Sequence, residues 1–411
     1  MPGRKRRLGR WWPGWVAPLA AVGAATAVAA APQAAVGAAH GPAAVLRADI
    51  AAAAARGSLP AAVGHCSRPG PQGTLTAYVV NNESGTVTPI DTVTNKALRP
   101  IKVGRLPAGA AVTPDCRTLY VVNTASNTVT PIRTATDTAL PPIKVGGGSQ
   151  TVAISPDGKT AYVAGVGVVT PIDTATNKPL PRIRVKQGSG PIAITPDGKT
   201  AYMIDDTSDM VTPIDLATKT ALAPIKVGFA PIWIAITPDG RTAYVANYYG
   251  GSVTPIDTAT NKALPQVKVG ASPDDMAFTP DSKTVYIVNS DDNTVTPIRT
   301  ATNTALPPIK VGALPGGIAM SPDGKTVYVG AQVGRTGPDI VTPIRTATNT
   351  ALRPIKVSSP AGLMAITPNG AAAYVVGYTG DTVMPVNLTT RTALSAIKVG
   401  QGPGWIVLAI R

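Results

Sequence analysis

Short apolar runs alternate with turn residues along most of the chain. Between residues 232 and 270, Thr-Pro-Asp-Gly at 237–240, a polar and glycine-containing stretch at 248–251 and Thr-Asn-Lys at 260–262 separate apolar runs of five to seven residues. Proline, aspartate and glycine favour β-turns, and apolar runs of this length between turns are typical of antiparallel strands. We therefore predict one four-stranded sheet, with strands over residues 232–236, 242–247, 252–258 and 264–269.

This unit recurs along the chain. A tyrosine in the second predicted strand marks each copy: Tyr78, Tyr120, Tyr162, Tyr202, Tyr244, Tyr286, Tyr328 and Tyr374. A proline in the third strand recurs in the same way, at Pro89, Pro131, Pro171, Pro213, Pro255, Pro297, Pro343 and Pro385. A period near 42 residues with four strands per repeat predicts a β-propeller. We expect each tyrosine to pack between blades, and each proline, which has no N–H to donate, to mark a bulge or a strand start.

The phase of the repeats predicts how the ring closes. The first copy begins at a second strand, near residue 75, whereas the last apolar run, at 405–410, is a first strand with nothing after it. Pairing of this last strand with the first copy would close the ring and leave no inner edge unpaired. The predicted fold is therefore an all-β propeller of four-stranded antiparallel blades. It has eight blades if every copy enters the ring and seven if one copy stays outside.

The repeated motif also resembles a known family. Tyr78-Val-Val-Asn81, Tyr120-Val-Val-Asn123, Tyr244-Val-Ala-Asn247 and Tyr286-Ile-Val-Asn289 each lie beside a Pro-Asp-Gly-type turn and a Val-Thr-Pro-Ile-Asp-Thr-like segment. With these motifs, residues 74–411 resemble the YVTN-type β-propeller repeat family. The resemblance implies a secreted, periplasmic or surface-layer propeller, often with seven blades, and the eighth copy departs from that number.

The N-terminal residues do not follow the repeat. Residues 1–39 combine an Arg- and Lys-rich start with an Ala- and Val-rich run, which is typical of an export signal. The run is also long enough for an uncleaved membrane anchor. In both cases the repeats are expected outside the cytoplasm, secreted or at the cell surface.

Residues 40–73, rich in Ala, Gly and Pro, are expected to form a linker or arm. The only two cysteines are Cys66 in this arm and Cys116 in a hairpin turn. In an exported protein they are candidates for a disulfide, and the alternative is two free thiols.

The loops between the second and third strands, and those that lead to the next blade, vary between copies and share one face. We call this the variable face, because repeat scaffolds diversify recognition in such loops. Its candidate ligand-binding residues are Asp205, Asp206, Asp209, Phe229, Trp233, Tyr248, Tyr249, Asp274, Asp275, Asp291, Asp292 and Trp405. They suggest a pocket for Ca²⁺, or for a ligand with cationic or sugar groups that stacks on the aromatic rings. The alternative is that the aspartates are solvated turn residues and that Trp233 and Trp405 fill the channel.

The net charge of +15 raises the question of an anionic partner. On the opposite face, here called the turn face, cations follow the turns at Arg117, Lys159, Lys199, Arg241, Lys283 and Lys325, and others occupy Lys96, Lys178, Lys219 and Lys262. They would attract an anionic polymer, or simply keep the turns soluble. A third set lies in the predicted outer strand, where lysines discourage pairing between sheet edges: Lys102, Lys144, Lys226, Lys268, Lys310, Lys356 and Lys398.

Catalytic motifs are scarce. The only histidines, His40 and His65, precede the repeats, which excludes a Ser-His-Asp triad, a His-ligated copper or a bis-His haem within the propeller. We therefore expect a non-catalytic, exported, monomeric binding scaffold without a cofactor. Its partner would be a protein, a glycan or a cell-wall polymer rather than nucleic acid, with membrane contact only through an uncleaved N-terminal segment. The alternatives are a divalent-cation-dependent hydrolase or lyase using Asp205, Asp275 and Asp292, and anionic-polymer binding through the turn face.

Overall fold

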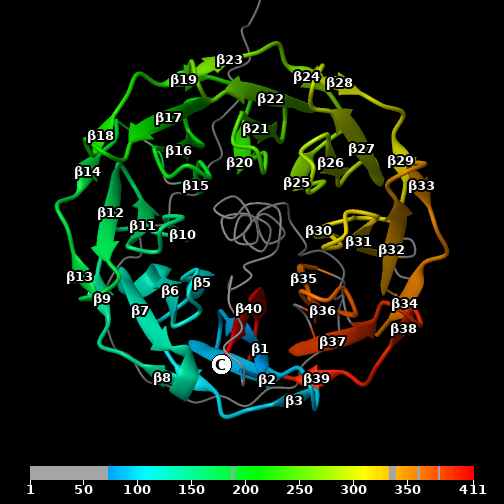
Figure 1. The fold of residues 1–411 in the computed structure, drawn as a ribbon, viewed down its shortest axis with the longest axis horizontal. Coiled ribbons are helices and arrows are strands. Elements are labelled where there is room, and N and C mark those ends of the chain that lie inside the picture. The colour runs from blue at the N-terminus through cyan, green and yellow to red at the C-terminus, as the bar shows by residue number, and fades with distance from the viewer. Residues whose placement is uncertain (1–72, 187, 189, 333–338, 359–361, 378–379) are drawn as a thin grey trace, which may run out of the picture. The chain divides into compact units, whose positions relative to one another are not determined.

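The computed structural model describes residues 73–411 except 187, 189, 333–338, 359–361 and 378–379. The chain divides into two compact units, Met1–Ala39 and His40–Arg411, and all described residues belong to the second. The expected signal and nearly all of the expected arm, Cys66 included, lie outside the described residues. The described residues form eight antiparallel sheets arranged as a ring of blades (Figure 1).

Each blade has its first strand nearest the axis and its last strand at the rim. In blade 5 these are β20 (Pro231–Ile236), β21 (Thr242–Asn247), β22 (Ser252–Asp257) and an outer strand in two segments, β23 (Lys262–Ala263) and β24 (Val267–Lys268). The four predicted strands are thus confirmed, except that the outer strand is interrupted.

The other blades repeat this order from axis to rim. Blade 1 contains β40 (Pro403–Ile410), β1 (Leu75–Asn81), β2 (Thr86–Asp91), β3 (Lys96–Ala97) and β4 (Ile101–Lys102). Blade 2 contains β5 (Pro107–Val112), β6 (Thr118–Asn123), β7 (Thr128–Arg133), β8 (Thr138–Ala139) and β9 (Ile143–Lys144), with short 3-10 helices η1 (Thr124–Ser126) and η2 (Thr134–Thr136). Blade 3 contains β10 (Thr151–Ile154), β11 (Thr160–Gly165), β12 (Val168–Asp173), β13 (Lys178–Pro179) and β14 (Ile183–Arg184). Blade 4 contains β15 (Ile192–Ile194), β16 (Thr200–Asp205), β17 (Met210–Asp215), β18 (Thr220–Ala221) and β19 (Ile225–Lys226).

Blade 6 contains β25 (Pro273–Phe278), β26 (Thr284–Asn289), β27 (Thr294–Arg299), β28 (Thr304–Ala305) and β29 (Ile309–Lys310). Blade 7 contains β30 (Ile318–Met320), β31 (Thr326–Gln332), β32 (Asp339–Arg345), β33 (Thr350–Ala351) and β34 (Ile355–Val357). Blade 8 contains β35 (Met364–Ile366), β36 (Ala372–Gly377), β37 (Thr382–Asn387), β38 (Thr392–Ala393) and β39 (Ile397–Lys398).

The two ends of the propeller sequence pair with each other. Strand β40 is antiparallel to β1, in a register that runs from Leu75 opposite Ile410 to Asn81 opposite Pro403. Blade 1 is therefore completed by the C-terminal strand, and the ring has eight blades. Both expectations from the phase of the repeats are confirmed.

The proline of the third strand explains the interrupted outer strand. The Leu264 N–H donates to the Pro255 carbonyl at 2.8 Å, but Pro255 has no N–H to return. Between the pairs Ile256–Ala263 and Val253–Val267, the outer strand therefore places three residues opposite two. The same shift occurs in blade 8, whose outer strand contains no proline, so the third-strand proline is the shared cause of this bulge.

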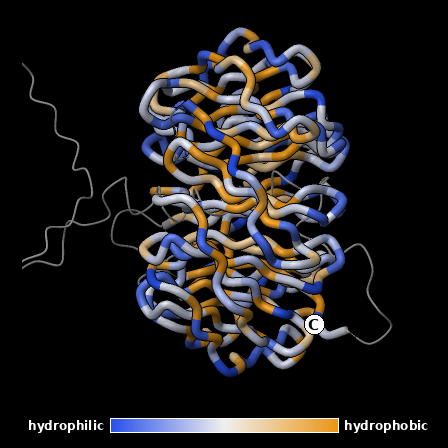
Figure 2. Tube along the Cα trace, turned by 90° about the vertical axis from the view of Figure 1, so that its left-hand side faces the viewer, coloured by the Kyte–Doolittle hydropathy of each residue, from blue (hydrophilic) through white to orange (hydrophobic). Residues whose placement is uncertain are grey.

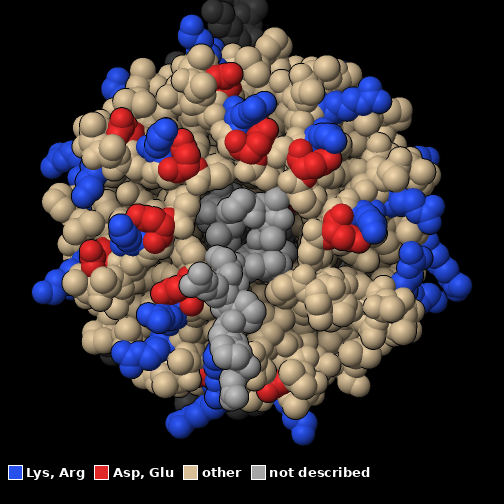
Figure 3. Space-filling view, viewed as in Figure 1, with Lys and Arg blue, Asp and Glu red and all other residues tan. Residues whose placement is uncertain are grey.

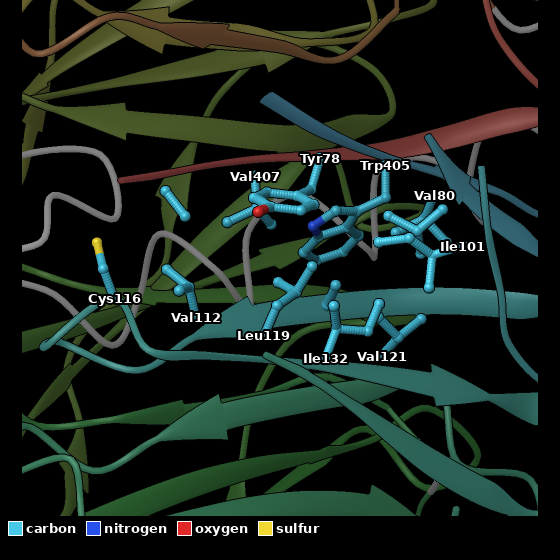
Figure 4. Packing of buried hydrophobic residues seen from close by; sticks show 13 residues of the cluster. Tyr78, Val80, Ile101, Val112, Cys116, Leu119, Val121, Ile132, Trp405 and Val407 are labelled. Carbon is cyan, nitrogen blue, oxygen red and sulfur yellow. The ribbon is translucent and has the colours of Figure 1, made fainter. Parts of the chain in front are cut away.

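The core lies mainly between blades. Figure 4 shows one cluster, in which Tyr78 and Trp405 of blade 1 pack against Leu119 and Val121 of blade 2. Seen from the side, hydrophobic segments lie within the disc and hydrophilic segments are frequent at both faces (Figure 2). The repeated tyrosines are buried, as expected.

Six of the eight tyrosine hydroxyls also donate a hydrogen bond to a turn of the next blade. Tyr120 donates to Asn177 Oδ1 at 2.7 Å, and Tyr374 of blade 8 donates to Asn95 Oδ1 of blade 1 at 2.7 Å. The same interblade tyrosine bond joins Tyr78 to Asp137, Tyr202 to Asn261, Tyr244 to Asn303 and Tyr286 to Asn349. The other two tyrosines, Tyr162 and Tyr328, face turns that carry Lys219 and Arg391 at this position, and neither side chain has a hydrogen-bond acceptor.

Several features recur four blades apart. Blades 1, 2, 5 and 6 have a bulge in the innermost strand, and in each the second strand ends in an asparagine opposite a proline: Asn81–Pro403, Asn123–Pro107, Asn247–Pro231 and Asn289–Pro273. Buried tryptophans occupy matching positions, Trp405 in blade 1 and Trp233 in blade 5. The junctions without the tyrosine bond, between blades 3 and 4 and between blades 7 and 8, are also four blades apart.

Within the described residues, no helix has the length and apolar character needed to cross a membrane.

Candidate functional site

The turn face carries acid–base pairs rather than isolated cations. Lys199 Nζ lies 3.6 Å from Asp197 Oδ2, and Lys283 Nζ lies 3.4 Å from Asp281 Oδ2. The same pairing joins Arg117 to Asp115, Lys159 to Asp157, Arg241 to Asp239 and Lys325 to Asp323. Figure 3 shows acidic and basic side chains side by side on this face. These exposed pairs contribute little stability, but they neutralise six of the cations considered for anionic-polymer binding.

On the variable face, the candidate aspartates of blade 4 hold their own loops. Asp205 is buried and accepts hydrogen bonds from the Thr207 N–H at 3.0 Å and from the Ser208 hydroxyl at 2.5 Å. Asp209 accepts the Ala230 N–H at 2.8 Å, which ties this loop to the loop that enters blade 5. Asp206, beside them, is half-buried. Asp205 and Asp209 therefore hold loop residues in place, a role that the local sequence did not indicate.

An exposed aromatic pair lies in the next loops. Phe229 is 61% exposed and Tyr249 is 60% exposed, and their ring centroids are 5.9 Å apart. Tyr248 is buried and meets Tyr249 edge-on, with 5.1 Å between ring centroids. Burial raises the pKa of Tyr248, and its hydrogen bond with Ser272 opposes that shift. The buried ring of Tyr248 thus contacts Tyr249, whereas the rings of Phe229 and Tyr249 remain exposed to solvent.

The aspartates of blade 6 brace the loop that enters that blade, but they remain exposed. Asp291 Oδ2 accepts the Ser272 hydroxyl at 2.6 Å, and Asp292 Oδ2 accepts the Ala271 N–H at 2.7 Å. Asp292 also lines an open cavity of about 400 Å³ at the rim between blades 5 and 6, together with Lys268 and Leu306. Tyr248, Ser272 and Asp291 therefore connect the aromatic pair to exposed carboxylates.

Asp274 and Asp275 are the most deeply buried of the candidate aspartates. They lie at the bulge of β25, nearest the axis, and are 1% and 0% exposed. Asp275 accepts the Met276 N–H at 2.8 Å and, across the blade junction, the Ile318 N–H at 3.2 Å. Asp274 accepts a hydrogen bond from the Ser290 hydroxyl. These two carboxylates do not share the exposed surface of Asp291 and Asp292.

The two candidate tryptophans are fully buried, at 0% exposure each. Trp233 packs with Tyr244 and Met276 between blades 5 and 6, and Trp405 packs between blades 1 and 2 (Figure 4). The structure therefore places both rings in the interblade core, where neither serves as a stacking surface nor fills the channel.

Cys116 is disulfide-bonded, and the only other cysteine of the sequence, Cys66, lies outside the described residues. Cys116 occupies the left-handed turn position (φ 62°) that holds Gly240 in blade 5. The disulfide of Cys116 is therefore attached to the hairpin turn of blade 2, which lies on the turn face. It therefore lies away from the variable-face candidates.

The sequence did not single out Leu106 and Leu314 on the variable face. Both are exposed, each precedes a proline at the entrance to a blade, and both have a positive φ, 47° and 48°. A leucine rarely adopts this backbone conformation. The sequence signal that could have identified these leucines is a Leu-Pro pair at the entrance to the blade, where other blades have Ala-Pro, Ser-Pro or Gly-Pro.

Among the described residues, no group of three or more His, Cys, Asp and Glu side chains is placed to hold a metal ion. The histidines are not among the described residues.

Comparison with solved structures supports the fold. The propeller is similar to dihydro-heme d1 dehydrogenase NirN in complex with DHE, with a TM-score of 0.69 and 14% identity over 80% of this chain and 74% of that one. It is also similar to Kuenenia stuttgartiensis hydrazine synthase, with a TM-score of 0.52 and 22% identity over 76% and 92% of the two chains. A functionally unknown protein from Desulfotomaculum acetoxidans gives a TM-score of 0.56 and 18% identity over 81% and 98%. At these identities the likeness shows the fold alone.

Among curated proteins, no sequence matches the chain significantly. A family model described as "Lactonase, 7-bladed beta-propeller" matches residues 65–306, which is more than half of the chain. The chain therefore belongs to this seven-bladed β-propeller lactonase family, although its own ring has eight blades.

Proposed function

We propose that the chain is an exported binding protein of the YVTN type, and that its variable face binds a cell-envelope glycan at blades 4 to 6. The observation that supports this most directly is the exposed pair of Phe229 and Tyr249. Large aromatic side chains contribute most to stability when they are buried, so two exposed rings in contact favour a role in recognition.

The neighbouring charges indicate the chemistry of the ligand. Asp291 and Asp292 are exposed one blade further along, and Asp206 is half-buried one blade before. Aromatic faces attract cations, and carboxylates pair with them. We therefore propose a glycan that carries amino groups, with its rings on Phe229 and Tyr249 and its ammonium groups toward Asp291 and Asp292.

Blade 1 supplies a fold-compatible variant for the test. Its equivalent loops have the same length, with Gln401 at the position of Phe229 and Glu83 at the position of Tyr249. In the double variant F229Q/Y249Q, which adds no carboxylate to the site, affinity for glucosamine oligomers should fall at least about tenfold, because two stacking surfaces are lost. Calorimetry would measure the affinity, and the melting temperature would verify folding.

The matched control is Val93→Ala, which removes an exposed apolar side chain (78% exposed) from a turn on the opposite face. It should bind glucosamine oligomers as the unchanged protein does. Equal binding by F229Q/Y249Q, or binding of N-acetylated oligomers with the same affinity, would exclude the proposed ligand class.

A second candidate function is lactone hydrolysis, which the family match favours. Opening a lactone requires an activated water, either through a carboxylate base or through a bound cation. Asp274 and Asp275 are the only acidic residues on the eight innermost strands, all of which lie in the described part of the chain. They are the residues that we would assign to this activity.

A panel of γ- and δ-lactones, assayed with and without Ca²⁺, tests this candidate. The activity should depend on the cation and be lost in Asp275→Asn, and Ca²⁺ should raise the melting temperature of the unchanged protein. Absence of both hydrolysis and a melting shift would leave the binding function alone.

A further inference from the structure

The outer strands carry unneutralised positive charge. In every blade the second segment of the outer strand begins with a buried isoleucine or valine, and the next residue is an exposed lysine or arginine. These eight cations are Lys102, Lys144, Arg184, Lys226, Lys268, Lys310, Lys356 and Lys398. No Asp or Glu occurs in any outer strand, and none of the ion pairs recorded among the described residues includes these cations. Figure 3 shows basic side chains at the outer edge of the disc.

These eight cations have one register. Lys102 lies opposite Thr86, and Lys144 lies opposite Thr128, so each cation is at the end of the third strand that is closer to the variable face. The strand order repeats in all eight blades, and the cations therefore form a ring with one cation in each blade, here called the cationic belt.

The outer strands are most basic along blades 1 to 3. Lys96 and Arg99 add exposed cations to the outer strand of blade 1, and Lys178 and Arg182 add them to the outer strand of blade 3. The nearby carboxylates Asp91 and Asp173 are engaged in their own turns, where they accept N–H groups of Thr94 and Thr176. Those hydrogen bonds come first among the causes that hold the pKa of Asp91 below its usual value.

We propose that the cationic belt along blades 1 to 3 binds a flexible, linear polymer of phosphate groups. Lys and Arg form strong charge-assisted hydrogen bonds with phosphate, and a chain with one charge at each link can follow a curved edge. A planar membrane would touch the convex rim over only a short arc. The proposal is independent of the glycan site, which lies at blades 4 to 6.

The turn face provides a control with the same charge. The belt variant K102Q/K144Q/R184Q and the turn-face variant R117Q/K159Q/K199Q each remove three exposed cations from three neighbouring blades. They leave identical net charges, so a difference between them reports on position alone.

Titration of the full chain with single-stranded oligo(dT) and with inorganic polyphosphate, at salt concentrations from about 0.05 to 0.2 M, tests the proposal. Each lost phosphate contact lowers the slope of log K against log[salt] by about 0.7, so the belt variant should lose about two units of slope and about 100-fold in affinity near 0.1 M salt. The turn-face variant should retain the slope. K102R/K144R should bind as the unchanged protein does, which separates lost charge from a disturbed edge strand.

Equal losses in the two Gln variants would overturn the proposal, because binding would then follow net charge. Absence of binding to both phosphate chains at about 0.05 M salt would also overturn it. Binding to vesicles that contain anionic lipid, without binding to either polymer, would assign the belt to a membrane instead. A preference for polyphosphate over oligo(dT), or the reverse, would identify which source of phosphate chain the belt binds.

Discussion

Replacing Tyr374 by phenylalanine should weaken the junction at which the ring closes. Tyr374 is 1% exposed, and its hydroxyl donates to Asn95 Oδ1 at 2.7 Å and lies 3.1 Å from the Thr92 carbonyl oxygen. The phenylalanine keeps the packing of the ring but removes this donor. Any loss of stability is then due to the hydrogen bond between blade 8 and blade 1.

The expected loss is about 1.5 kcal/mol. A hydrogen bond contributes about 0.5–1.5 kcal/mol net, and a buried acceptor left unpaired costs about 1–3 kcal/mol. Asn95 is half-buried, so water can replace part of the lost bond, which favours the lower end of the combined range. With an unfolding entropy near 2 cal/mol/K per residue, a propeller of about 340 residues should melt about 2 °C lower.

Tyr328→Phe is the matched control, because Tyr328 occupies the same register and its turn position carries Arg391 instead of an acceptor. Differential scanning calorimetry of both variants measures the effect. Tyr328→Phe should change the melting temperature by less than about 0.5 °C, since no bond between blades is lost. If the two variants have the same melting temperature, the Tyr374 hydroxyl does not stabilise the contact between blades 8 and 1, and packing alone explains the repeated tyrosine.

Three further outcomes follow from the same structure. Lys219→Asn and Arg391→Asn should each raise the melting temperature by about 1–2 °C, because both positions have φ 57°, which asparagine adopts more readily, and each variant restores an acceptor. Deletion of residues 403–411 should abolish cooperative melting, measured by circular dichroism, because β1 would lose its partner and the buried Trp405 and Leu408 would be removed; an equally stable deletion variant would contradict ring closure. Burial raises the pKa of Tyr286 and of Tyr374 to about 12, above the value near 10 in an unfolded chain. Their contribution to stability is therefore complete below about pH 10 and is lost as the pH rises to about 12, at about 1.4 kcal/mol per unit for each tyrosine, so alkaline denaturation should begin near pH 10 and should be shallower in Tyr286→Phe.

Most of the fold could be predicted from the sequence because its signals are local. Turn residues such as those at 237–240 act within four positions, and the tyrosine repeat identifies eight copies of the blade without reference to contacts. Whether all eight copies enter the ring was decided by the pairing of β40 with β1. The split outer strand was not predicted, because it depends on which neighbour Pro255 faces across the sheet. Lys219 and Arg391 likewise looked like ordinary turn residues until the opposing tyrosines were located.

The candidate site was harder to predict. Trp233 and Trp405 follow bulges in the innermost strands, and one extra residue reverses which face of a strand the preceding and following side chains occupy. Strict alternation could not have placed them. The sequence indicated that Asp205 and Asp209 were available to a ligand. In the structure, Asp205 accepts hydrogen bonds within its own loop, and Asp209 accepts one from a residue 21 positions away.

The recurrence of features every four blades separates the requirements of the fold from those of binding. Trp233 matches Trp405 and Asn247 matches Asn81, so these residues meet needs that both halves of the ring share. At the positions of Phe229 and Tyr249, blade 1 has Gln401 and Glu83 in loops of equal length. A propeller blade therefore forms these loops with polar residues, and packing does not require aromatic rings there. Exposed rings that the fold does not need support the proposed ligand contact, and the exchange F229Q/Y249Q should therefore leave the ring intact and remove binding.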